Sequence, residues 1–75
     1  MKELVEVIAK ALVDHPDEVV VTEETEGRNV RLKLHVAASD MGKVIGRQGR
    51  IARAIRSVVK AASIRDNIRV DVDID

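Results

Sequence analysis

Two glycines separated by two polar residues, Gly46-Arg47-Gln48-Gly49, form the segment of this 75-residue chain that is best suited to hold an anion. Gly46 can adopt the left-handed conformation that ends a helix, and Gly49 offers backbone that a phosphodiester can approach closely. The first amides of a helix that begins after Gly49 lack intrahelical acceptors and lie at the positive end of its dipole. The pattern therefore predicts a phosphate-binding turn between two helices.

Basic residues gather around this turn. The segment from Gly42 to Lys60 contains six basic residues and no acidic one: Lys43, Arg47, Arg50, Arg53, Arg56 and Lys60. The chain as a whole is neutral, because residues 1–27 hold two basic and eight acidic residues and residues 66–75 hold one and four. A basic middle between acidic ends suggests a surface that meets a polyanion, although the acidic ends could equally fold back and neutralise it.

The composition argues against several classes of function. The chain has no Phe, Tyr or Trp, so it cannot stack bases on aromatic rings as RRM and OB domains do. With no Cys and two His, it has few metal ligands and no thiol nucleophile. Nothing matches a Walker loop, and the pattern places no histidine near Ser39. We therefore expect a protein that is not an enzyme and that uses no metal or cofactor.

Apolar periodicity predicts the order α-β-β-α-α-β in one domain over residues 1–75. The predicted elements are a helix at 2–14, strands at 18–24 and 30–36, helices at 40–45 and 50–64, and a strand at 68–74. Pro16 ends the first helix, and Ser39 is the predicted cap of the second. No apolar run reaches the length of a membrane span and no signal peptide is apparent, so we expect a cytoplasmic protein.

Strict alternation in the strands at 30–36 and 68–74 predicts one face on a core and one in water. The right-handed crossover rule places the third strand beside the second and parallel to it. The open face then sets Arg31 and Lys33 against Asp71 and Asp73, which makes it a poor anion site.

The last helix has an apolar arc that is predicted to pack on the core. Its members are Ile51, Ile55, Val58 and Ala62. Ala52 and Val59 lie at the edge of this arc, which leaves them as candidates for a contact with a second copy.

The element order and the run VIGRQGRIARAI resemble a KH domain, an RNA-binding module whose GxxG loop clamps about four nucleotides. The leading helix and strand are similar to the type II, bacterial arrangement and to its small stand-alone members. The resemblance implies an α+β fold, with a three-stranded mixed sheet and three helices on one face. It also implies a chaperone-like regulator of RNA, with a bearing on cell shape and peptidoglycan.

Carried onto this chain, the resemblance makes residues 46–49 the clamp for single-stranded RNA, with an aliphatic floor and flanking basic residues. The valines and isoleucines of this floor could equally pack in the core. The implied RNA-binding residues are Lys43, Val44, Ile45, Gly46, Arg47, Gln48, Gly49, Arg50, Ile51 and Arg53, with one or two residues of the strand at 30–36. It further implies self-association, or pairing with a second KH protein of the KhpB (Jag) type. Two alternatives stay open: a protein–protein adaptor that mainly dimerises, and binding of single-stranded DNA.

Overall fold

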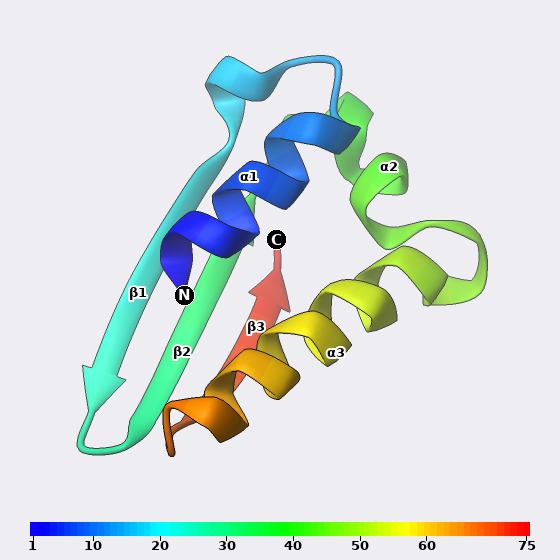
Figure 1. Ribbon diagram of the computed structural model, residues 1–75. Helices are drawn as coiled ribbons and strands as arrows, with labels where there is room; N and C mark the ends of the chain where they lie inside the picture. The colour runs from blue at the N-terminus through cyan, green and yellow to red at the C-terminus, as the bar shows by residue number, and fades with distance from the viewer.

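The computed structural model describes all residues from Met1 to Asp75 and has the predicted order of elements (Figure 1). The helices are α1 (Lys2–Leu12), α2 (Met41–Ile45) and α3 (Arg50–Arg65), and the strands are β1 (Val20–Glu26), β2 (Asn29–His35) and β3 (Arg69–Ile74). Short 3₁₀ turns lie at Pro16–Glu18, Ala38–Asp40 and Arg47–Gly49. The predicted fold class, α+β with a mixed three-stranded sheet and three helices, is confirmed. No helix has both the length and the apolar character that crossing a membrane requires.

The sheet has β2 at its centre, paired antiparallel with β1 and parallel with β3. The register sets Arg31 beside Asp71 and Lys33 beside Asp73, as the sequence predicts, and Arg31 Nε lies 3.9 Å from an oxygen of Asp73. Basic and acidic side chains thus alternate across the open face. This arrangement leaves both edges of the sheet, β1 and β3, without a further strand.

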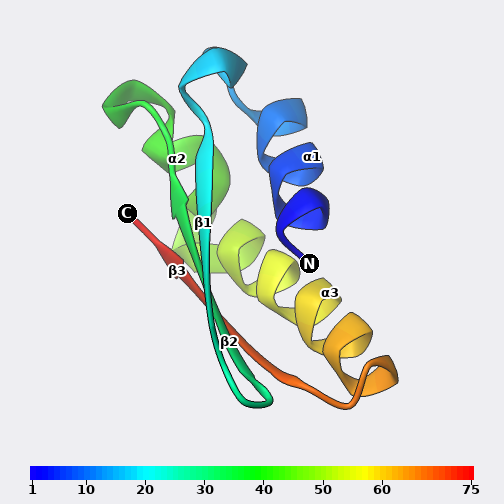
Figure 2. The ribbon, with the colours of Figure 1, turned by 90° about the vertical axis from the view of Figure 1, so that its left-hand side faces the viewer.

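The hydrophobic core lies between the other face of the sheet and the helices. Figure 2 shows α1 and α3 to one side of the sheet. Leu32 and Leu34 of β2 are fully buried, and the rest of the core is aliphatic: Val5, Ala9, Val19, Val21, Val30, Val36, Val44, Ile55, Val59 and Val72. The short helix α2 packs against α3 and α1, so the core also positions the turn that follows α2.

The buried face of α3 differs from the predicted arc. Val58, expected in the core, is 47% exposed, whereas Val59, expected at the edge, is 1% exposed and belongs to the core. The small residues Ala52 and Ser63 are also buried, and α3 packs against both β3 and α1. Contact with two neighbours rotates the buried arc away from the centre that apolar periodicity alone predicts. The assignment of Val59 to an interface between copies is therefore wrong.

Two smaller expectations also need correction. Helix α1 ends at Leu12, before residue 14. Ser39 does not cap α2; the N-cap residue is Asp40, and no side chain donates or accepts a capping hydrogen bond there. The carboxylate of Asp40 is used for a different contact, described below.

Candidate nucleic-acid interface

The turn between α2 and α3 depends on backbone conformations that favour glycine. Gly46 has φ 75° and ψ 174°, a region that is almost exclusive to glycine, and Gly49 is left-handed with φ 72° and ψ 17°. Between them Gln48 is also left-handed, with φ 57°. A Cβ on Gly46 would lie 2.6 Å from Cγ1 of Ile51, whereas a Cβ on Gly49 would have no neighbour within 4 Å. Gly46 therefore shapes the turn, and Gly49 leaves open space beside it.

Hydrogen bonds inside the turn use some of the amides expected to face an anion. The amide of Gly49 donates to Gly46 O at 3.1 Å, and the amide of Arg50 donates to Arg47 O. Arg53 reaches back from α3, and its Nη2 donates to the carbonyl of Gln48 at 2.9 Å. The turn is thus braced by its own backbone and by one arginine. The electrostatic attraction for an anion rests more on side chains than the sequence predicts.

A hollow of about 420 Å³ opens beside the turn, between the start of α3 and the end of β3. Its lining consists of Ile45, Gln48, Gly49, Ala52, Arg53, Arg56 and Ile74. We call it the loop groove. Three of its residues are apolar, two are arginines and none is acidic. A groove with an aliphatic floor and a basic wall suits a nucleic acid, which carries both flat bases and phosphates.

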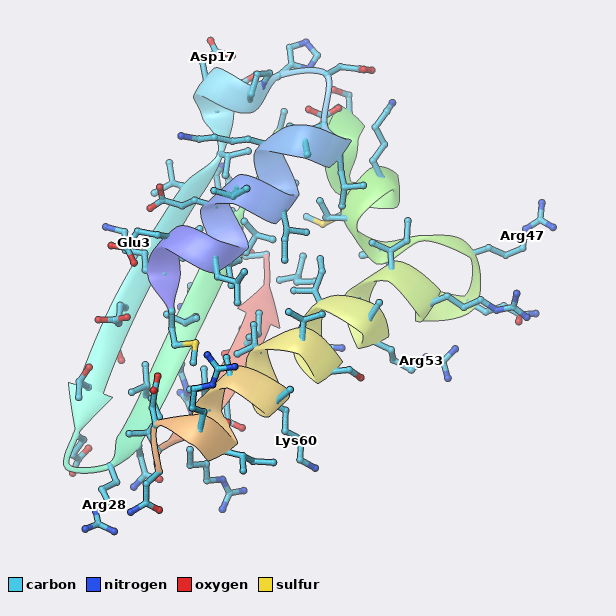
Figure 3. The ribbon with its side chains drawn as sticks, viewed as in Figure 1. Glu3, Asp17, Arg28, Arg47, Arg53 and Lys60 are labelled. Atoms are coloured by element: carbon cyan, nitrogen blue, oxygen red, sulfur yellow. The ribbon has the colours of Figure 1, made fainter.

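The basic residues around the turn are largely free of acidic partners. No carboxylate lies within 4.0 Å of a side-chain nitrogen of Arg47, Arg50, Arg53, Arg56 or Lys60. Figure 3 shows Arg47 projecting outward from the turn, with Arg53 and Lys60 extending to one side of α3, away from Glu3 and Asp17. Of the two interpretations of the charge pattern, the structure favours a basic surface that the acidic ends do not neutralise.

Lys43 is the exception among these basic residues. Its Nζ lies 2.9 Å from Oδ2 of Asp14, and this hydrogen bond, with the attraction of the same carboxylate, raises the pKa of Lys43. The ammonium group is therefore already paired within the protein. Its predicted role beside the nucleic acid is weakened accordingly.

Asp40 joins the segment after α1 to the start of α2. Its carboxylate is 1% exposed and accepts the backbone N–H groups of Asp14, at 3.1 Å, and His15, at 3.0 Å. The same carboxylate lies 3.2 Å from Nδ1 of His15. Burial raises the pKa of Asp40, but these hydrogen bonds and the attraction of His15 outweigh burial and lower the pKa below its ordinary value of 3.8. Asp40 thus anchors the helix that carries the turn.

The structure brings most of the predicted binding residues together at the turn and its groove. Arg47, Gln48, Arg50 and Arg53 are exposed there, and Ile45 lines the groove. Val44 is 0% exposed and belongs to the core, so its predicted contact with a base is wrong. Ile51 is half-buried beneath Gly46 and supports the turn rather than lining the groove.

Sequence reasoning missed part of the groove. Arg56 lies one helical turn beyond Arg53, and Ile74 of β3 stands where a residue of the strand at 30–36 was expected. Ala52, predicted at an interface between copies, lies in the groove floor instead. The sequence could have pointed to Ile74. The predicted parallel placement of the last strand makes β3, rather than the central β2, the edge of the sheet beside α3.

Comparison with known proteins agrees with this geometry. The family model described as "KhpA/KhpB, KH domain" matches residues 2–74. The chain belongs to this family of KH domains. Its fold accordingly has the type II KH arrangement.

Individual relatives match over nearly their whole length. The RNA-binding protein KhpA of Clostridium acetobutylicum is 61% identical over 74 residues, which cover 99% of each chain. The RNA-binding protein KhpA of Clostridium perfringens is 60% identical with the same coverage. The RNA-binding protein KhpA of Halalkalibacterium halodurans is 57% identical over 99% of this chain and 97% of its own.

Proposed function

We propose that this protein binds single-stranded RNA and does so without catalysis, as a small regulator or chaperone of RNA in the cytoplasm. The observation that carries the proposal is the loop groove, in which a glycine turn, two arginines and an aliphatic floor meet with no acidic residue. Membership of the KhpA/KhpB family, whose relatives are named RNA-binding proteins, supports the same function.

In this mechanism the turn holds the backbone and the groove holds the bases. A phosphate beside Gly49 meets open space, and Arg47 and Arg50 supply mobile positive charge. Bases lie on Ile45 and Ile74, with Arg53 and Arg56 along the wall. Since the chain has no aromatic side chain, binding depends on phosphate contacts, and we expect a Kd of roughly 10⁻⁴ to 10⁻⁶ M for a generic single strand.

The experiment that tests this function changes Arg47 and Gln48 together to aspartate. Both side chains are exposed, and Asp tolerates the left-handed conformation of residue 48 better than most residues do. The loop loses one positive charge and gains two negative ones, and unit charges about 4 Å apart near a surface interact by up to ~4 kcal/mol. Fluorescence anisotropy with labelled RNA should show that binding is abolished.

The control for this experiment is a measurement that the double variant is still folded. Circular dichroism should give a melting temperature within a few degrees of the wild type, because substitutions at exposed sites change stability by about 0.5 kcal/mol or less. A folded double variant that still binds RNA would refute the clamp and favour the adaptor function. The same titration with DNA of the same sequence tests the second alternative, because contacts to the 2′-hydroxyl distinguish the two nucleic acids.

We also propose self-association, or pairing with a KhpB-type KH protein, as a second property. Since Val59 is core, the apolar residues of α3 that remain exposed are Val58 and Ile64, and Val58, at 47% exposed, is the one we assign to such a contact. Helix α1, which packs against α3, adds the exposed Val7. Sedimentation of the wild type and of Val58→Asp tests this property, with the monomer as the expected state of the variant.

A further inference from the structure

A second and larger hollow lies farther along the same side of α3. It measures about 660 Å³ and is bounded by the second half of α3 and the outer edge of β3. Its lining consists of Arg31, Arg56, Lys60, Ser63, Ile64, Ile68, Arg69, Val70, Asp71, Val72 and Asp73. We call it the strand hollow. Arg56 lines both this hollow and the loop groove, so the two adjoin each other along α3.

Only some of the charged side chains in the strand hollow are free to bind a ligand. Asp73 is 3.9 Å from Nε of Arg31, and the register sets Asp71 beside Arg31 and Asp73 beside Lys33. The two carboxylates are thus largely neutralised by Arg31 and Lys33. Lys60 and Arg69 form no ion pair. Free positive charge therefore remains on the α3 side of the hollow and at the start of β3.

The wall of the hollow formed by β3 carries outward backbone groups that, apart from the carbonyl of Val72, have no partner. The amides of Arg69 and Asp75 donate to β2 and its preceding turn, so the alternate residues 70, 72 and 74 direct their N–H and C=O groups outward. The carbonyl of Val72 accepts a hydrogen bond from Nε of Arg56 at 3.2 Å, which is in keeping with this direction. Such groups can pair with the polar edge of a base.

An exposed apolar residue completes the hollow. Ile64 is 72% exposed on the last turns of α3, and the half-buried Ile68 lines the hollow as well. An aliphatic side chain can cover the face of a base where no aromatic ring is present. Free cations, outward backbone groups and aliphatic surface thus lie together in the strand hollow, next to the groove beside the turn.

We propose that the strand hollow is a second RNA subsite, which receives the nucleotides adjoining those held at the loop groove. Phosphates lie toward Lys60 and Arg69, away from Asp71 and Asp73, and bases lie against Ile64 and the outer edge of β3. This proposal rests on the proposed function, since the RNA enters the strand hollow from its binding site at the turn Gly46–Gly49. From Arg53 to Lys60, α3 advances about 10 Å, so the second subsite extends the footprint beyond about four nucleotides.

The test compares two RNA lengths on the full chain. Fluorescein-labelled oligouridylates of about four nucleotides and of about twice that length are titrated by anisotropy against wild type and Lys60→Ala/Arg69→Ala. The control is Lys2→Ala/Lys10→Ala, which removes the same charge from α1, a helix that lines neither hollow. A longer RNA also has more binding registers, but this statistical gain is the same for every protein variant and cancels in the comparison.

We expect the wild type to bind the longer RNA several-fold more tightly, and the Lys60/Arg69 variant to lose most of that gain while it binds the short RNA unchanged. For the longer RNA, the log–log slope of affinity against salt should fall by about 0.7 for each phosphate that the variant no longer neutralises. An unchanged gain, or an equal loss of affinity on both lengths or in the α1 control, overturns the second subsite. If the wild type binds neither RNA, the proposed function itself fails and the subsite falls with it.

Discussion

Gly46 lies directly over the side chain of Ile51, so closely that a Cβ at position 46 would stand 2.6 Å from Ile51 Cγ1. The half-buried Ile51 packs against the core and lies in the first turn of α3. The turn that is proposed to hold RNA therefore packs on the core through the contact between this glycine and this isoleucine. The second glycine of the turn, Gly49, has no such neighbour.

This difference predicts unequal effects for two alanine substitutions. Gly46→Ala should destabilise the protein strongly, because it adds a clash with Ile51 to a backbone conformation that is almost exclusive to glycine. Gly49→Ala has open space and should cost only the left-handed strain, about 1 kcal/mol. Thermal unfolding followed by far-UV circular dichroism measures both. Equal melting temperatures for the two variants would contradict the role assigned to Ile51.

The rotation of α3 about its axis, which decides which residues face the core, gives a second prediction. Val59→Asp should unfold the protein, because an unpaired carboxylate in the core costs several kcal/mol, comparable with the whole stability of a small domain. Val58→Asp is the matched control, with the same change one residue earlier on exposed surface, and it should keep its helical circular dichroism spectrum. The reverse result would show that the sequence-based arc, with Val58 inside, was right.

Local features of the sequence predicted the elements well, since alternation, helical periodicity, Pro16 and the glycines act over a few residues. The buried face of α3 was mispredicted because its two packing partners, β3 and α1, decide which residues are buried. The apolar pattern of one helix carries no information about those partners. Asp40 was not recognised as a buried anchor, because its partners Asp14 and His15 are 26 and 25 residues away along the chain. Ile74 was missed for the same reason: it lies beside the start of α3 in space but far from it along the chain.

The buried carboxylate of Asp40 predicts how stability depends on pH. Its pKa is lowered on folding, so its ionised form stabilises the fold above the ordinary value of 3.8, and this contribution disappears as the pH falls below that value. Asp40→Asn should lower the melting temperature at neutral pH, because an amide nitrogen would face donors from residues 14 and 15. It should also flatten the decline of stability in acid.

Melting temperatures measured from neutral to strongly acidic pH test this prediction. Asp17→Asn is the control, since Asp17 is exposed and forms no ion pair. That variant should follow the wild-type curve throughout. An Asp40→Asn variant with the wild-type acid profile would remove Asp40 from the account of acid stability.

Arg53 combines two roles that one pair of substitutions can separate. Its Nη2 donates to the carbonyl of Gln48 at 2.9 Å and braces a left-handed residue of the turn, while its charge lies along the groove. Arg53→Lys keeps the charge but loses the planar fork that reaches this carbonyl. RNA affinity should fall several-fold, corresponding to about 1 kcal/mol for one hydrogen bond, while the salt dependence of binding stays the same.

Arg50→Lys is the control for this last prediction, because the guanidinium of Arg50 makes only a 3.5 Å contact with Oε1 of Gln48 and braces no backbone group. It should bind RNA almost as the wild type does, with the same salt dependence. If both lysine variants lose affinity equally, guanidinium contacts to the RNA are responsible and the brace is not. If neither does, the charge of Arg53 alone accounts for its part in binding, and the backbone of Gly46–Gly49 holds the turn without it.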